Sequence, residues 1–268
     1  MLRASGRSPT PADVFPLKDN IPTERFPVVT VLLIAINCIV YLFLQPKSGI
    51  DFSGGSLNQA SLVHYGFIPY EITHWGQHCD LVSQGIACGA HGASSQLPTW
   101  VTPFTAMFTH AGLLHLGGNM LFLWIFGNNV EDAMGPFRFI VFYLLAGLAA
   151  TGLQLAFGPN SATPNLGASG AIAGVLGGYI LMYPRAKVVT VVFIIFLFTI
   201  LELPAILFIG IWFAEQLALG ALQSSDTVAG GGVAYWAHVG GFAAGLVLIK
   251  AFATRRSQAA DGPRFPVY

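Results

Sequence analysis

The chain has 268 residues, of which 54% are hydrophobic and only 9% are charged, whereas an ordinary soluble domain carries about 25% charged residues. Its 12 basic and 12 acidic residues give a net charge of zero, which excludes a nucleic-acid-binding protein that works through a basic surface. The apolar content excludes a disordered chain, and three cysteines are too few for a disulfide-built scaffold. The composition indicates a protein that crosses a membrane several times.

Six apolar segments are candidates for membrane-spanning helices, which need about 20 residues each. The polar, proline-rich first 27 residues contain no cleavable signal peptide, so we expect the first apolar segment to be a retained anchor. The predicted spans are 28–44, 112–127, 139–157, 169–183, 205–222 and 233–252. The apolar stretch 188–203 is interrupted near its end by Glu202, and we interpret it as an interfacial hairpin rather than an early start of the fifth span.

The positions of Lys and Arg predict which side of the membrane each end of the chain occupies. Eleven of the 12 precede the first span, follow the second or fourth span, or lie at or beyond the end of the sixth, and only Lys47 falls on the opposite side. Because positive residues stay cytoplasmic, both termini are predicted to be cytoplasmic. We therefore expect a cytoplasmic segment 1–27, a six-span domain 28–252 with a long extracytoplasmic loop 45–111, and a cytoplasmic tail 253–268.

Three polar clusters lie in apolar surroundings, where polar residues are costly. His115 and Asn119 stand four residues apart at the start of the second predicted span, so they share a helix face. Ser169, preceded by Gly167, begins the fourth span, and His238 lies near the start of the sixth. These three spans are predicted to run from outside to inside, so the clusters can meet at one depth in the outer half of the bundle.

The fourth predicted span is short for a membrane. Ser169 to Tyr183 is 15 residues, or about 22 Å of helix, against a hydrocarbon core about 30 Å thick. Ser169 would then begin its helix below the outer membrane surface, where the non-helical residues 160–168 would line protein or water. A hydroxyl, an imidazole and an amide in a wet pocket inside a membrane suggest hydrolysis.

A serine nucleophile needs a base within hydrogen-bonding distance, and His238 is the candidate base for Ser169. No aspartate lies near the three clusters, and Glu202 and Glu215 lie toward the fifth span. The sequence therefore predicts a Ser–His dyad rather than a triad.

An acyl-transfer intermediate also carries an oxyanion that preorganised donors must stabilise. The backbone N–H of Ser169 at a helix N-terminus is one candidate donor, and the side chains of His115 and Asn119 are others. Gly167 and Gly170 would let the backbone turn sharply and approach a substrate closely.

Some of these polar and small residues have a structural interpretation. Small residues permit close contact between membrane helices, and Gly170, with the Gly241 and Gly245 pair, fits a contact of the fourth span with the sixth. Such a contact would place the two dyad residues side by side. His110 is interpreted as a hydrogen-bonded structural residue of the loop before the second span.

Three motifs occur in order along the predicted spans, and together they resemble the rhomboid family of intramembrane serine proteases. They are His115-Leu-Gly-Gly-Asn119, Gly167-Ala-Ser169-Gly170 and Ala237-His238-Val-Gly-Gly241. The resemblance runs from Phe15 to about Ala251 and implies an all-α membrane protein, a bundle of six transmembrane helices. It also implies a Ser169 nucleophile, a His238 general base, and an oxyanion site made by Ser169, His115 and Asn119. The implied partners are single-pass membrane proteins, cut in or near their spans within the lipid; we expect no cofactor, no metal and no nucleic acid.

Two positions depart from the usual pattern of the family. Many relatives carry Trp-Arg before the second span, whereas Trp100 is followed here by valine. Many relatives also place a Tyr or Phe four residues after the nucleophile, stacked on the catalytic histidine, whereas this position is Ala173. The ring that would orient His238 is therefore missing or comes from elsewhere, and Tyr235 and Trp236 are its neighbours in sequence.

Two other functions compete with a protease. A non-catalytic relative that binds client membrane proteins would be expected to lose Ser169 or His238, and this chain keeps both. A transporter would hold ionisable residues and broken helices in matching halves, for which Glu215 and Gln216 are the only hint. We expect a multi-pass protein of a bacterial cytoplasmic membrane with its site open to the extracytoplasmic side, because no Arg-rich, Ser-rich transit segment is found.

The long outer loop contains Cys79 and Cys88 together with His74, His78 and His91. Cysteine and histidine at such intervals can bind zinc. The predicted position outside the cytoplasm favours oxidation of the thiols instead, and the third cysteine lies in the first span. We therefore favour a Cys79–Cys88 disulfide over a zinc site.

Overall fold

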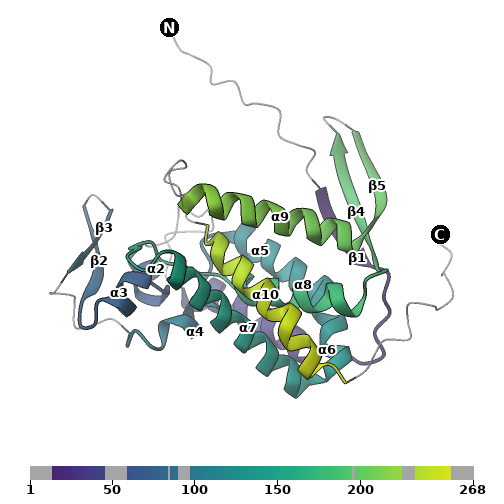
Figure 1. Cartoon of the computed structure of the whole chain (residues 1–268), viewed down its shortest axis with the longest axis horizontal. Helices are drawn as coiled ribbons and strands as arrows, with labels where there is room; N and C mark the ends of the chain where they lie inside the picture. Colours follow the sequence, from purple (N-terminus) through teal and green to yellow (C-terminus); the bar gives the residue numbers. More distant parts are fainter. Residues whose placement is uncertain are drawn as a thin grey trace, which may run out of the picture.

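The computed structural model describes residues 14–45, 59–83, 85–89, 97–194, 197–224 and 233–254. Most of these residues are helical (Figure 1). The helices are α1 (Val28–Ile39) continued by η1 (Val40–Leu44), α2 (Gln59–Tyr65), α3 (Pro69–Thr73), α4 (Thr102–Ala106), α5 (Leu113–Phe122) continued by η2 (Leu123–Gly127) and α6 (Asn128–Met134), α7 (Pro136–Phe157), α8 (Ser169–Met182), α9 (Ala205–Ser224) and α10 (Tyr235–Phe252).

Each of the six segments predicted to span the membrane is helical in the structure. Among the described residues, three helices are long and apolar enough to cross a membrane, and two shorter helices are also apolar. The three are Pro136–Phe157, Ala205–Gln223 and Tyr235–Phe252, and the two are Val28–Leu44 and Ser169–Met182. The chain is thus a helical membrane protein, and the count of six crossings with cytoplasmic termini stays a prediction.

Helix α10 packs against α7 and α8 and, over a smaller contact, against α9 (Figure 1). The start of α7 is set by Gly135, which has a positive φ of 82° and ends α6, and by Pro136 at the first helical position. The helix ends at Phe157, before Gly158. It is therefore three residues longer at its start than the predicted span.

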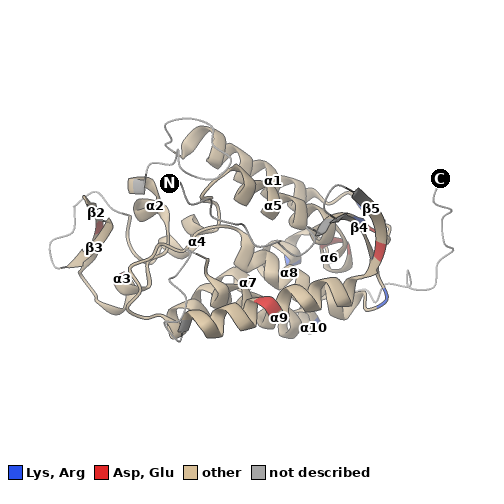
Figure 2. Cartoon of the chain, turned by 90° about the horizontal axis from the view of Figure 1, so that it is seen from above, with Lys and Arg blue, Asp and Glu red and all other residues tan. Residues whose placement is uncertain are grey.

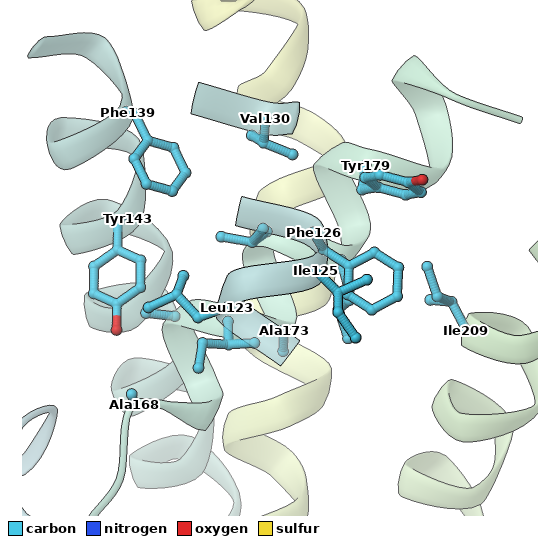
Figure 3. Close-up of a cluster of buried hydrophobic side chains, with 14 of the residues drawn as sticks. Leu123, Ile125, Phe126, Val130, Phe139, Tyr143, Ala168, Ala173, Tyr179 and Ile209 are labelled. Atoms are coloured by element: carbon cyan, nitrogen blue, oxygen red, sulfur yellow. The ribbon is translucent and has the colours of Figure 1, made fainter. Parts of the chain in front are cut away.

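The core of the bundle lies where η2 and α6 meet α7 and α8 (Figure 3). Leu123 and Phe126 of η2 point toward the centre, with Tyr143 of α7 on one side and Tyr179 of α8 on the other, and all four are fully buried. The Phe126 and Tyr179 rings meet edge to face with centroids 4.9 Å apart, a favourable aromatic geometry. This core fixes α8 relative to α5 and η2.

The expectation of an all-α protein is wrong in one respect, because the described residues contain two small sheets. One has the antiparallel order β1 (Val14–Asp19), β4 (Lys187–Ile194) and β5 (Leu197–Pro204). Val, Ile, Thr and Phe dominate β4 and β5, and these residues favour strands. Strands β4 and β5 thus form a hairpin and α9 starts only at Ala205, which confirms the hairpin but leaves its place at the membrane interface a prediction.

Strand β1 lies within the predicted cytoplasmic segment 1–27. It pairs with β4, and its last residue, Asp19, accepts hydrogen bonds from Tyr179 Oη and Asn129 Nδ2, both at 2.6 Å. Strand β1 is therefore attached to the end of α8 that lies farthest from Ser169.

Charge is confined largely to the ends of the long helices and to the loops (Figure 2). In α9 the single acidic residue is Glu215. Most other coloured positions in this view lie near α6 and the β4–β5 hairpin. Apart from Glu215, which is exposed at the middle of α9, the long helices α7, α8, α9 and α10 carry charged residues only near their ends, as a lipid-embedded surface favours.

The second sheet is the hairpin of β2 (His78–Val82) and β3 (Gly85–Gly89). Cys79 and Cys88 face each other in its register and are joined by a disulfide, which confirms the predicted bond. Both thiols are consumed, so neither can serve as a zinc thiolate. His91, the third histidine of the proposed alternative, lies outside the described residues.

Candidate active site

Ser169 and His238 meet where two neighbouring helices begin. Ser169 is the first residue of α8, and His238 lies in the first turn of α10. The Nε2 atom of His238 is 2.8 Å from Ser169 Oγ. This distance is within the range in which a base can take a proton from a hydroxyl.

Glycines allow α8 and α10 to approach closely enough for this contact. A Cβ atom on Gly241 would overlap the carbonyl oxygen of Gly170, and one on Gly245 would overlap that of Gly174. The backbones of the two helices are therefore in direct contact, as small residues permit in membrane proteins. Any larger side chain at Gly241 or Gly245 would separate the two helices, and with them the serine and the histidine.

A glutamine on α7 fixes the start of α10. The Oε1 atom of Gln154 accepts a hydrogen bond of 3.1 Å from the backbone N–H of Ala237, which also donates to the carbonyl oxygen of Ala234. Amides at a helix N-terminus lack the usual acceptor four residues earlier in the helix. Gln154 was not among the predicted site residues. Its signal is an amide side chain in an otherwise apolar stretch of α7.

The second ring nitrogen of His238 is bound by a residue of α9. Its Nδ1 atom lies 2.7 Å from Oε1 of Gln216, which is buried. Trp212, one turn earlier on α9, places its ring 5.7 Å from the imidazole. Gln216 was predicted only as a hint of transport. The signal that it belongs to the site is its spacing of four residues from Trp212, which places both on one helix face.

The ring contact on His238 therefore comes from α9. Trp236, its neighbour in sequence, instead stacks on Phe157 with centroids 3.7 Å apart. Ala173 is fully buried and offers only a methyl group. The departure at Ala173 is accordingly balanced by Trp212 on a different helix.

His115 and Asn119 approach the loop before Ser169 from α5. The Nδ1 atom of His115 accepts a 3.3 Å hydrogen bond from the backbone N–H of Ala111, so Nε2 carries the ring proton and is a donor. Gly167 has a φ of 109°, and a Cβ there would lie 2.7 Å from His115 Nε2 and 3.5 Å from Asn119 Nδ2. Glycine at this position thus leaves room for both donors.

The Asn119 amide is a buried donor beside this loop. Its Nδ2 atom is buried and has no hydrogen-bond partner among the described residues. A buried donor without a partner is unfavourable unless a ligand or water satisfies it. Asn119 is therefore ready to bind an oxygen atom placed beside Gly167.

His110 braces the loop that leads to the serine. Its ring is fully buried, and Nε2 accepts a long 3.5 Å hydrogen bond from the backbone N–H of Ala168. Gln45, after η1, holds the His110 backbone through both of its amide atoms, at 2.7 and 3.2 Å. Gln45 was missed by the sequence analysis, because its partner is 65 residues away and is a backbone group.

A pocket opens beside Ser169, with a volume of about 410 Å³ when the part open to solvent is counted. Its wall includes Gly167, Asn165 and Gln154. Residues 158–168 form no helix, and Asn165 exchanges two backbone hydrogen bonds with Phe67, at 2.9 and 2.8 Å. The non-helical backbone expected at 160–168 therefore lines a pocket and is held by the loop after the first span.

The arrangement has the parts that acyl transfer requires. A hydroxyl donates to an imidazole whose other nitrogen is bound, and N–H groups gather around the loop that precedes the hydroxyl. A pocket lined in part by Ser169 and Gly167 lies beside the hydroxyl. Among the described residues, no group of three or more potential metal ligands is found.

Comparison with known proteins gives a consistent result. Residues 97–255, more than half of the chain, match the family model of the Rhomboid domain. The chain is 32% identical over 151 residues to the rhomboid protease GluP of Bacillus subtilis (strain 168), which covers 56% of this chain and 24% of the relative. It is also 32% identical over 145 residues to Rhomboid protein 1, mitochondrial, of Saccharomyces cerevisiae, which covers 52% of this chain and 38% of that relative.

A third relative is RHOMBOID-like protein 1 of Arabidopsis thaliana, 32% identical over 161 residues, which are 57% of this chain and 34% of the relative. The chain thus spans less than two fifths of the length of each of these curated relatives. The Rhomboid domain match contains all three motifs that carry the polar clusters. The chain therefore belongs to the rhomboid family.

Proposed function

We propose that this protein is an intramembrane serine endopeptidase that acts through a Ser169–His238 dyad. The observation that carries the proposal is the 2.8 Å hydrogen bond between Ser169 Oγ and His238 Nε2. It occurs among apolar helices of a rhomboid family member, beside a pocket. Serine and histidine in this relation are the minimal unit for nucleophilic cleavage of a peptide bond.

In the proposed reaction, Ser169 Oγ attacks the carbonyl carbon of the scissile peptide while His238 Nε2 takes the hydroxyl proton. The carbonyl oxygen becomes an oxyanion, which the Ser169 N–H, His115 Nε2–H and Asn119 Nδ2–H groups stabilise. The imidazolium then gives its proton to the departing amine, and an acyl-enzyme forms. Water, deprotonated by the same histidine, releases the carboxylic acid and restores the serine. Protein groups fill every role, so the proposal needs no cofactor.

The substrates we propose are single-pass membrane proteins, cut in or near their spans. The dyad lies at the beginning of apolar helices, so a substrate must present its peptide bond within or beside the lipid. The pocket beside Ser169 would receive the side chains that flank the scissile bond.

We also propose six crossings with both termini in the cytoplasm and the site open to the extracytoplasmic side of a bacterial membrane. The distribution of Lys and Arg supports this orientation. Thiol labelling from outside intact cells tests it: after reduction, Cys79 and Cys88 should react with a membrane-impermeant reagent. Labelling only after lysis would contradict the orientation.

The test of the chemistry uses a fluorophosphonate probe, which reacts with an activated serine. The purified full-length protein should be labelled, and the Ser169→Ala variant should not. Co-expression with a panel of single-span proteins should give cleavage products with the wild type alone. A wild-type protein that is neither labelled nor active but retains those single-span proteins on purification would instead support the non-catalytic, client-binding alternative.

A further inference from the structure

We propose that Gln216, assisted by Trp212, is a positioning residue for the His238 imidazole, so that α9 completes the unit that α8 and α10 begin. The inference rests on the proposed function, because it gives these two residues their role through the dyad. Neither touches the reacting atoms. Their role is to fix which nitrogen of His238 carries the proton and where the ring points.

The contact with Gln216 determines the tautomer of the His238 imidazole. The Oε1 atom of Gln216 is only an acceptor, so the 2.7 Å contact with Nδ1 requires the proton on Nδ1. The Nε2 atom then carries a lone pair and can accept the hydroxyl proton of Ser169, 2.8 Å away. In this orientation of its amide, Gln216 therefore stabilises the tautomer that a general base needs.

The Gln216 amide is buried and is itself held by His238. Gln216 is 5% exposed, although it lies on a helix in which only four of residues 205–223 are buried. A buried amide that stays without partners is unfavourable in an apolar environment. The Gln216–His238 hydrogen bond satisfies the amide and fixes the imidazole, so each side chain holds the other in one orientation.

The ring of Trp212 also contacts the His238 imidazole. Trp212 precedes Gln216 by one turn, so both lie on the face of α9 turned toward His238. The ring centroids of Trp212 and His238 are 5.7 Å apart and the planes are inclined by 39°. At Ala173, the position on α8 from which relatives supply a ring, a methyl group cannot limit rotation of the imidazole. Trp212 provides this restraint from α9.

The experiment compares six full-length variants of the purified protein in detergent, and two of them, Trp212→Leu and Trp212→Phe, test the ring contact. Gln216→Met has a similar volume but no acceptor, Gln216→Glu keeps an acceptor at the same distance, and Gln216→Asn withdraws it by one methylene. Glu215→Gln is the matched control, because Glu215 is the exposed neighbour on the same helix. The readouts are kcat and KM for a cleaved single-span substrate, the rate of fluorophosphonate labelling, and the melting temperature.

We expect Gln216→Met and Gln216→Asn to lower kcat by about 10- to 100-fold, part of the 10²- to 10⁴-fold that a positioned base contributes. KM should stay within about twofold, and labelling should slow in parallel, because these residues act only on the orientation of the base. Gln216→Glu should restore most of kcat. Trp212→Leu should lower kcat by a smaller factor, with partial recovery in Trp212→Phe, and Glu215→Gln should match the wild type.

Equal kcat in the wild type and both Gln216→Met and Gln216→Asn would overturn the inference. Loss of activity in Gln216→Glu as deep as in Gln216→Met, together with a lower melting temperature in all three variants, would assign the glutamine a purely structural role and would also overturn it. A wild-type protein that neither cleaves nor reacts with the probe would reject the proposed function itself, an outcome distinct from either of these.

Discussion

Helices α8 and α9 flank α10 on different sides, and they are packed very differently. In α8, nine consecutive residues are buried, from Ala171 to Tyr179. In α9, only four of residues 205–223 are buried, although both helices are apolar along their length. Apolarity alone therefore does not tell which helix occupies the centre of a bundle in a membrane.

The difference lies in the size of the residues. Helix α8 carries four glycines on the faces that meet α7 and α10, and α9 carries two, of which Gly210 faces open space. In lipid, apolar surface alone does not drive helices together, so close packing of small residues and polar contacts must do it. Helix α8 uses the first means, whereas α9 reaches the site through the amide of Gln216.

The largest effect should come from the contact across the closely packed pair. Ser169→Ala and His238→Ala should each lower kcat by about 10⁴-fold or more, because each removes one member of a unit. The double variant should be no slower than either single variant. Cleavage kinetics on one substrate provide the measurement, with melting temperatures as the control for folding. Appreciable cleavage by Ser169→Ala would exclude this serine as the nucleophile.

Removing Asn119 should have the next largest effect. Asn119→Ala takes away one donor to the oxyanion, which is worth on the order of 10²–10³ in rate, and the Ser169 and His115 donors remain. The loss should appear in kcat more than in substrate binding. An unchanged kcat would remove Asn119 from the oxyanion site and leave it as part of the packing of α5.

The packing difference itself can be tested with two alanines. Gly245→Ala puts a methyl group against the backbone of Gly174 and should destabilise the bundle by about 1–3 kcal/mol. Gly210→Ala meets no atom within 4 Å and should be neutral or stabilise α9 by up to about 1 kcal/mol. Denaturation in detergent compares the two. Equal destabilisation would mean that α8 and α9 are packed alike in the membrane protein.

The smallest expected effect is a change of stability with pH, and it arises at the end of α8 farthest from Ser169. Burial raises the pKa of Asp19 from its ordinary 3.8 to about 6, despite the hydrogen bond from Tyr179 that opposes the shift. Between these two pH values the folded chain holds a proton that the unfolded chain has released, so stability should rise as the pH falls through this window.

The free energy of unfolding should change by about 1–2 kcal/mol across this window. This figure is smaller than the full pKa shift implies, because solvent screens a partly exposed carboxyl group. Asp19→Asn should remove this pH dependence without affecting the cleavage chemistry, because the site lies at the other end of α8. Melting temperatures measured between pH 4 and 6.5 test it. A slope of opposite sign in the wild type would contradict the assigned burial of the carboxyl group.

Much of this arrangement follows from local patterns in the sequence. Apolar segments between Pro and Gly predict the six long helical regions, and the cysteine pair predicts the disulfide. The contact of Ser169 with His238 follows from glycines at helical spacing on two spans, because that spacing leaves room for backbone contact. These inferences succeed because each depends on residue types and spacings that are visible within single predicted spans or loops.

The parts that could not be predicted depend on partners far apart in sequence. Strand β1 pairs with residues more than 160 positions away, and nothing in its own six residues specifies that partner. Gln216 is adjacent to Glu215, and the sequence does not show which of these two polar residues is buried. Which of two adjacent polar residues faces the bundle depends on the rotation of the helix, and the uniformly apolar neighbours leave that rotation open.

The disulfide in the β2–β3 hairpin has a consequence for how the protein is made. Disulfides form in oxidising compartments and are kept reduced in the cytosol. A copy inserted with the predicted orientation passes this hairpin to the oxidising side, whereas an inverted copy keeps both thiols in a reducing one. In the intact cell, the oxidation state of Cys79 and Cys88 therefore reports the direction in which each molecule entered the membrane.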